Sequence, residues 1–200
     1  MLSTRVALGS FPLACIAVSV GPRWGLAVMI ITDTDLPSQR RSPSAARILT
    51  NDVLVRSIRS TELKPSRLQR DDNKRPDGAT LDPWSRGKYL VWDFTCPDTL
   101  APSHLPRSST AAGSAAVAAE CKKQSKYIEL SRSGDYAFVP VAIETLGSWG
   151  PSALDVTAEI GGRIARCTGD IRSTTFLRQR LDIAIQKGNA AAVHGTMAAG

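Results

Sequence analysis

Residues 89–96 read Tyr-Leu-Val-Trp-Asp-Phe-Thr-Cys, and this stretch decides the fold. Apolar side chains fall on both faces of the run, which is typical of a central strand that is covered on two sides. Asp93 is the one charged residue inside it. A buried carboxylate is costly unless it is paired or bound to a cation. Asp93 is therefore the most informative residue of the chain.

A second carboxylate precedes this strand in a predicted hairpin. Residues 77–84 form a short extended stretch, residues 85–88 supply the turn, and the strand 89–96 follows. Adjacent strands lie about 4.8 Å apart, so Asp77 and Asp93 could share one divalent cation. Taken alone, Pro76-Asp77-Gly78 is an ordinary turn sequence, and Asp77 could simply cap that turn.

The flanking sequence predicts an α/β fold, a small mixed sheet with helices on both faces. Apolar spacing indicates a helix over residues 45–60, and residues 61–75 form a loop with at most one short strand. Prolines make 97–109 a loop, the alanine-rich stretch 110–130 favours a helix, and 136–145 is a further strand. A helix begins at Pro151-Ser152 with Asp155 as its capping-box acid, and a last helix over about 173–187 stops at Gly188.

These patterns divide the chain into three parts. Residues 1–44 are an atypical N-terminal segment with a linker, residues 45–188 the folded domain, and residues 189–200 a frayed tail. The apolar run 6–20 behind Arg5 imitates a signal peptide. Because Pro12, Pro22 and Arg23 interrupt the apolar stretches, a membrane span is not expected. A structural role for this segment is favoured over targeting.

The net charge and the cysteine content limit which binding partners and metal sites can be expected. The net charge is +7 with a pI near 9.6, and residues 1–75 hold twelve Lys and Arg against six Asp and Glu. Such an excess of positive charge favours a polyanionic partner, either nucleic acid or an anionic membrane surface. A solvated, arginine-rich surface without a partner would have the same composition. The cysteines at 15, 96, 121 and 167 are scattered singletons, which excludes a zinc site of close ligand spacing.

A lysine cluster supplies the third part of a possible hydrolytic site. Lys122, Lys123 and Lys126 lie toward the end of the predicted helix 110–130. Lysines at a helix end are usually solvated and complement the helix dipole. Beside a metal held by two carboxylates, a lysine could instead orient the attacking water or neutralise phosphorane charge. Phosphodiester hydrolysis needs little else.

The order of these motifs resembles the PD-(D/E)xK restriction-like endonuclease domain of site-specific non-LTR retrotransposon reverse transcriptase polyproteins. The resemblance rests on Pro76-Asp77, on Asp93 followed by Thr95, and on the K-x-x-K-Y pattern at 123–127. In that family the lysine of the (D/E)-x-K strand has moved to the following helix, and Thr95 stands here where that lysine would be. The likeness covers roughly residues 45–195. The Cys/His zinc knuckle that precedes the nuclease in the family is missing from residues 26–46.

The resemblance implies a restriction-endonuclease-like core and a Mg²⁺- or Mn²⁺-dependent nickase acting on DNA, with nuclear localisation and no small-molecule substrate. It implies that Asp77 and Asp93 are metal ligands, that Lys126 acts on the water side, and that Lys123 can substitute for it. Asp52 is a speculative additional acid on the first helix. Phosphate contacts are expected from five basic residues: Arg70, Lys74, Arg75, Arg86 and Lys88. The resemblance also implies that the chain is a detached C-terminal piece of such a polyprotein. The alternative is a catalytically inactive, transposon-derived remnant that at most binds nucleic acid.

Overall fold

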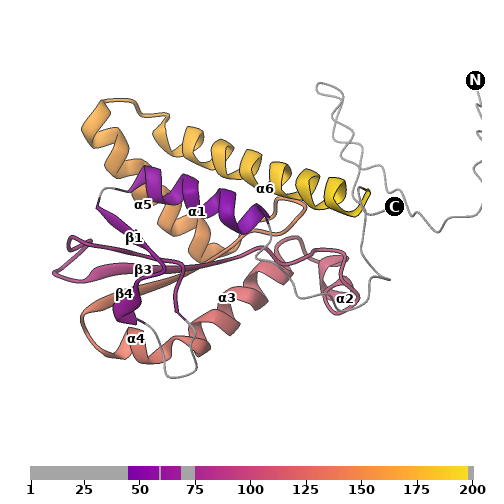
Figure 1. Cartoon of the computed structure of the whole chain (residues 1–200), viewed down its shortest axis with the longest axis horizontal. Coiled ribbons are helices and arrows are strands. Elements are labelled where there is room, and N and C mark those ends of the chain that lie inside the picture. The colour runs from indigo at the N-terminus through magenta and orange to yellow at the C-terminus, as the bar shows by residue number, and fades with distance from the viewer. Residues whose placement is uncertain (1–44, 59, 69–74, 198–200) are drawn as a thin grey trace, which may run out of the picture. The chain divides into compact units, whose positions relative to one another are not determined.

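The computed structural model describes residues 45–58, 60–68 and 75–197, which belong to a compact unit spanning residues 40–200 (Figure 1). The expectations for residues 1–44, for Arg70 and for Lys74 fall outside the described residues. The elements follow in the order α1 (Ala45–Ser57), β1 (Thr61–Leu63), a 3₁₀ turn (Ser66–Leu68), β2 (Gly78–Thr80), β3 (Tyr89–Thr95), α2 (Leu105–Ser108), α3 (Ser114–Lys126), α4 (Ile128–Arg132), β4 (Tyr136–Ala142), α5 (Pro151–Thr168) and α6 (Ser173–Met197).

A mixed sheet forms the centre of the unit, with strand order β1-β2-β3-β4. Strands β1, β2 and β3 are antiparallel neighbours, whereas β3 and β4 run parallel. The connection between the parallel strands passes through α2, α3 and α4. Pro140 lies opposite Asp93 in β4, and proline is tolerated there because β4 ends the described sheet on that side.

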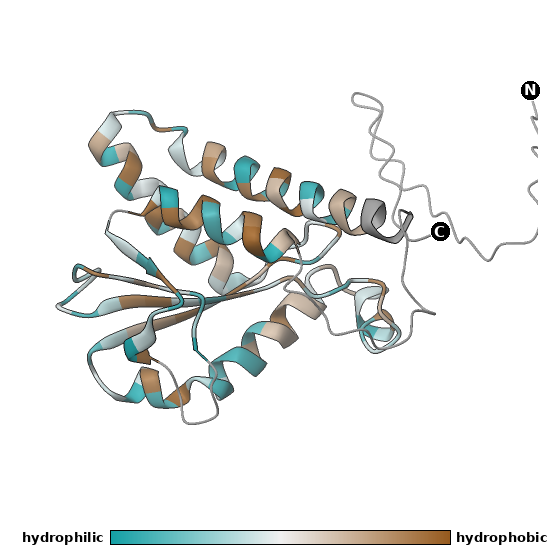
Figure 2. Cartoon of the chain, viewed as in Figure 1, coloured by the Kyte–Doolittle hydropathy of each residue, from teal (hydrophilic) through white to brown (hydrophobic). Residues whose placement is uncertain are grey.

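Helices cover both faces of this sheet (Figure 1), so the α/β fold class is confirmed. Leu90, Trp92 and Phe94 of β3 enter the larger core with apolar residues of α1, α5 and α6. Val91 faces the other way, into a smaller core with Tyr127 and Phe138. Both faces of β3 are buried, as its continuous apolar sequence predicts. Figure 2 shows the hydrophobic segment of β3 between the helices that cover the two faces of the sheet.

Three elements differ in extent from the sequence prediction. The loop expected over 97–109 contains the short helix α2, which accepts Pro106 because the proline lies in its first turn. The helix expected over 110–130 is broken between α3 and α4 at Tyr127, whose backbone leaves the helical region. Tyr127 is fully buried against Phe138, so ring packing accompanies the break. The extended stretch 77–84 is a strand only over 78–80.

The start of α5 at Pro151 was predicted correctly, but its capping residue and the end of α6 were predicted wrongly. Asp155 forms no capping box at the start of α5, because Glu120 of α3 accepts the bonds from the backbone amides of Ser152 and Ala153 instead. Gly188 does not stop α6, which continues to Met197. A Cβ at Gly188 would lie 2.3 Å from the Cα of Ala46. This glycine therefore serves the close crossing of α1 and α6, and the predicted tail 189–200 is helical up to residue 197.

No helix among the described residues is both long enough and apolar enough to span a membrane.

Candidate functional site

Asp77 lies directly before β2, beside Asp93 of β3, and the two carboxylates face the same side. The amide of Asp77 donates to the carbonyl oxygen of Trp92 at 2.9 Å. Its Oδ2 accepts a bond from the amide of Phe94 at 3.0 Å. Strand β2 begins at Gly78, where a Cβ would lie 2.1 Å from the Trp92 ring. The glycine thus lets the indole cover β2 while Asp77 turns toward Asp93.

Arg47 of α1 binds both carboxylates. Its Nε donates to Oδ2 of Asp77 at 3.0 Å and its Nη2 to Oδ1 of the same residue at 2.6 Å. The same Nη2 lies 3.3 Å from Oδ1 of Asp93. One turn further along α1, Asn51 accepts a bond from Nε1 of Trp92 at 3.1 Å. This bond ties the helix to the strand that carries Asp93 and so positions the guanidinium.

Lys64 supplies a second cation to Asp77. Its Nζ donates to Oδ1 of Asp77, and its backbone amide donates to the Asp77 carbonyl oxygen at 2.8 Å. Lys64 has a φ of 50°, a region that non-glycine residues rarely adopt. Because of this turn at the end of β1, the backbone amide and the side chain of Lys64 both bind Asp77.

The helix α3 brings the two predicted lysines to Asp93. Nζ of Lys123 lies 3.0 Å and Nζ of Lys126 3.8 Å from Oδ2 of Asp93. Lys126 also donates to the hydroxyl of Tyr127 at 2.8 Å. The lysines are three residues apart, so they share one face of the helix. All four predicted catalytic residues, Asp77, Asp93, Lys123 and Lys126, are therefore together.

Burial and charge set the ionisation of this cluster. Burial alone would raise the pKa of the Asp77 carboxyl, but the hydrogen bonds and charges of Arg47 and Lys64 outweigh it and lower the pKa to about 2. Burial and the adjacent Asp93 charge raise the pKa of the Tyr127 hydroxyl. Asp77 is therefore ionised and Tyr127 neutral at pH 7. Tyr127 can donate a hydrogen bond but does not serve as a base.

Four cationic side chains surround the two carboxylates: Arg47, Lys64, Lys123 and Lys126. Both carboxylates are almost fully buried, while the cations keep side-chain exposures of 19% to 43%. The outward surface of the cluster is thus positive. An excess of exposed cations over buried carboxylates suits an anionic ligand such as a phosphate group.

None of the contacts described for the cluster involves the other predicted residues that the structure describes. Arg75 is exposed two residues before Asp77. Arg86 and Lys88 lie at the turn between β2 and β3. Four strand residues separate Lys88 from Asp93, so the turn lies roughly 17 Å away along the strand. Asp52 points to solvent and pairs with Arg56 on its own helix, so its speculative role as an added acid is wrong.

Two further buried acids, Glu120 and Glu144, have structural partners. Glu144 accepts the amides of Ala115 and Ala116 at the start of α3, and its other oxygen accepts the Thr99 hydroxyl. Glu120 caps α5 in the same way. Such carboxylates satisfy amides that a helix N-terminus leaves unbonded. Neither acid contributes to the carboxylate cluster.

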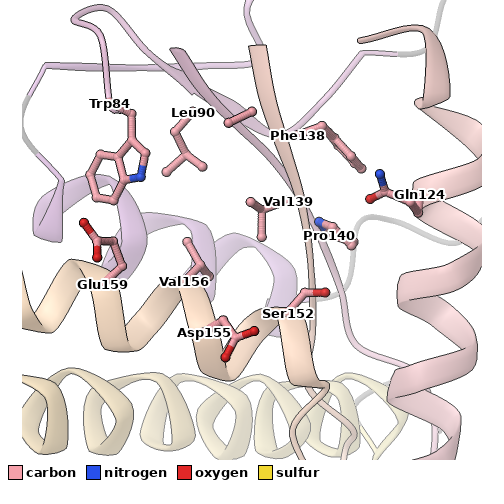
Figure 3. Close-up of a pocket in the computed structure, with 11 residues that line it drawn as sticks. Trp84, Leu90, Gln124, Phe138, Val139, Pro140, Ser152, Asp155, Val156 and Glu159 are labelled. Carbon is pink, nitrogen blue, oxygen red and sulfur yellow. The ribbon is translucent and has the colours of Figure 1, made fainter. Parts of the chain in front are cut away.

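A hollow of about 360 Å³ lies elsewhere, beside β4 (Figure 3). Its apolar side chains include Trp84, Val139 and Val156, and Asp155 and Glu159 of α5 add two carboxylates. None of the four predicted catalytic residues lines it. This hollow and the carboxylate cluster are therefore separate places.

A divalent cation fits the carboxylate pair in donor chemistry. Mg²⁺ and Mn²⁺ prefer carboxylate oxygens, and one oxygen of each aspartate already contacts the same cationic atom of Arg47. Among the side chains that the structure describes, those of residues 45–58, 60–68 and 75–192, no group of three or more His, Cys, Asp or Glu could hold a metal. Asp77 and Asp93 would therefore hold the ion with waters or substrate oxygens completing its shell.

Arg47, Lys64 and Tyr127 were not predicted as site residues. The basic stretch that includes Arg47 and Lys64 was visible in the sequence, but nothing in that stretch distinguishes these two from Arg56. Comparison with known proteins adds no assignment: no family model matches the chain, and no curated protein sequence matches it.

Proposed function

We propose that this chain is a divalent-metal-dependent DNA endonuclease domain of retrotransposon origin that nicks duplex DNA. The observation that carries the proposal is the convergence of Asp77 and Asp93 with Lys123 and Lys126 on one side of the sheet. These residues come from the start of β2, from β3 and from α3, with Asp77 directly before Gly78, and their order along the chain is the order of the family motif. The α/β core expected for that family accompanies them.

Each residue has a role that its surroundings allow. Asp77 and Asp93 are paired with cations inside the fold and would hold the metal, which would supply Lewis acidity and activate a bound water. Lys126, with an exposed fraction of 29%, can bind the phosphate and neutralise charge that develops on it. Lys123 is closer to Asp93 and less exposed, so it positions that carboxylate. The hydroxyl of Tyr127 holds Lys126 in place.

Nicking of supercoiled plasmid tests the proposal. The wild-type protein should convert the plasmid to the open circle with Mg²⁺ or Mn²⁺ and not with EDTA. Asp77→Ala and Asp93→Ala should each reduce the rate by about 100-fold or more, since each removes a metal ligand. Asp52→Ala is the matched control, because Asp52 is exposed and pairs only along its helix. Equal nicking by the wild type and both site variants would refute the proposed endonuclease activity of this site.

A second candidate is a nucleic-acid-binding domain without turnover. The specific observation in its favour is that both carboxylates are already paired with protein cations, which leaves the surface of the cluster positive. Such a protein would bind DNA, with affinity falling steeply as salt increases. It would show no nicking at any metal concentration. Binding without nicking therefore selects this candidate over the endonuclease.

A further inference from the structure

The contacts of Arg47 suggest a control on metal binding at the carboxylate pair. Nη2 of Arg47 lies within 3.3 Å of one oxygen from each aspartate, Oδ1 of Asp77 and Oδ1 of Asp93. Nε completes a two-pronged contact with Asp77. The guanidinium therefore stands where the two carboxylates converge. Among the side-chain contacts described for the two aspartates, it is the one that joins them.

A divalent ion and this guanidinium cannot share that place. Mg²⁺ binds carboxylate oxygens at about 2.1 Å, and an ion that touched both Oδ1 atoms would lie against Nη2. Their like charges would repel strongly at such a separation in a buried setting. Binding of the ion therefore requires that the guanidinium withdraw.

Arg47 is able to withdraw, but a change of pH does not release it. The guanidinium of an arginine stays charged in proteins. Burial lowers the pKa of Arg47, but the hydrogen bond to Asp77 and the charges of Asp77 and Asp93 outweigh burial and raise it. Its side chain is 31% exposed, so part of it already reaches solvent. A phosphate group at the mouth of the cluster would offer the withdrawn guanidinium a bidentate partner.

We propose that Arg47 is a built-in competitor of the metal, which holds Asp77 and Asp93 together until a divalent ion and a nucleic-acid phosphate replace its contacts. The inference rests on the proposed function, because it assumes that the carboxylate pair is a metal site. The free protein then binds divalent ions weakly, and DNA strengthens that binding. Arg47 is a positioning residue in the free protein and a phosphate contact in the complex.

Calorimetric titration of the DNA-free protein with Mn²⁺ tests this inference directly. Arg47→Gln removes the charge and keeps most of the side-chain length. It should tighten Mn²⁺ binding at least about tenfold, the equivalent of one lost charge-assisted hydrogen bond. Arg56→Gln is the matched control, since Arg56 lies on the same helix, is 67% exposed and pairs only with Asp52. That variant should bind Mn²⁺ as the wild type does.

Thermal unfolding gives a second readout. Without metal, Arg47→Gln should melt below the wild type, because two buried carboxylates lose a shared partner. Saturating Mn²⁺ should raise the Tm of Arg47→Gln more than that of the wild type. A purely structural arginine would lower the Tm equally with and without Mn²⁺. If Arg47→Gln does not fold, Arg47→Lys is the second variant. It keeps the positive charge but loses the two-pronged contact with Asp77, so its gain in Mn²⁺ affinity should be intermediate.

The outcomes separate this inference from the proposed function. Equal Mn²⁺ affinity in wild type and Arg47→Gln, together with metal-dependent nicking by the wild type, would overturn the competitor role alone. No Mn²⁺ binding by any folded variant, together with no nicking, would overturn both. Tighter binding by Arg47→Gln without nicking would support the competitor role and leave the chain a metal-binding domain without turnover.

Discussion

At the residue scale, the proposed chemistry of the site depends on two buried aspartates that the fold pairs with cations. Neither carboxylate has the solvent that would normally stabilise its charge, since both are almost fully buried. Arg47, Lys64 and the lysines of α3 replace that solvent. Removing one partner leaves an uncompensated buried charge, so single substitutions here should affect both stability and any activity.

Asp77→Asn should make stability less sensitive to acid. The Asp77 pKa is lowered from 3.8 to about 2, so its charge stabilises the fold above about pH 4, and that contribution disappears as the pH falls through about 2. At pH 7 the variant should lose about 2 kcal/mol of unfolding free energy, and the loss should vanish near pH 2. Denaturant titrations across this range measure it, with Asp52→Asn as the exposed control. A loss that is constant with pH would contradict the assignment.

The two lysines should differ in their effects on nicking. Lys126→Ala should slow the nicking step by about 100-fold or more, because Lys126 is the more exposed of the pair and has Tyr127 to orient it. Lys123→Ala should act more weakly and mainly through Asp93. Lys122→Ala, on the exposed side of the same helix, should leave the rate unchanged. Single-turnover nicking rates distinguish these residues. A larger loss of rate in Lys123→Ala than in Lys126→Ala would contradict this assignment and make Lys123 the lysine that acts on the phosphate.

At the scale of the elements, the site depends on how α1 is held over the sheet. Arg47 reaches the carboxylates only because α1 lies close to both α6 and β3. Gly188 allows the first of these contacts and the Asn51–Trp92 bond secures the second. The helix that carries the proposed competitor of the metal is therefore fixed by residues far from the site in sequence.

Gly188→Ala should weaken the fold although alanine favours helices. The added Cβ would lie 2.3 Å from Cα and backbone N of Ala46, so α1 and α6 must separate, at a cost of about 1–3 kcal/mol. Gly162→Ala in α5 is the matched control, since its nearest neighbour would be 3.8 Å away. That substitution should be neutral or stabilising by up to about 1 kcal/mol. Equal melting temperatures for the two variants would argue against the close crossing.

At the scale of the whole molecule, charge and the separation of surfaces decide how DNA could bind. The net charge of +7 favours a polyanion, and the carboxylate cluster presents cations outward. The turn with Arg86 and Lys88 lies at the far end of the β2–β3 hairpin. A duplex bound at both places would extend along the hairpin, so the turn would add phosphate contacts beyond the cleavage site.

The double variant Arg86→Ala/Lys88→Ala should therefore bind duplex DNA more weakly without losing the chemical step. If both residues contact phosphates, the slope of log affinity against log salt should fall by about 2. Fluorescence anisotropy over a salt series measures the slope, and nicking at saturating DNA serves as the control. An unchanged slope would show that the turn does not contact DNA. Of the predicted phosphate-binding residues that the structure describes, Arg75 would then remain as the candidate.

The sequence by itself determined the α/β class and the central strand, because each depends on local pattern. The family resemblance selected Asp77, Asp93, Lys123 and Lys126, which lie together in the fold, and their catalytic role stays a prediction. An apolar run with one carboxylate predicts a covered strand with a special residue, and lysines three apart share a helix face. Only the tertiary structure decided that Arg47 and Lys64 complete the cluster and that Gly188 continues a helix. It also decided that Glu120, rather than Asp155, caps α5. These outcomes depend on contacts between residues 13 to more than 100 positions apart, which local periodicity does not encode.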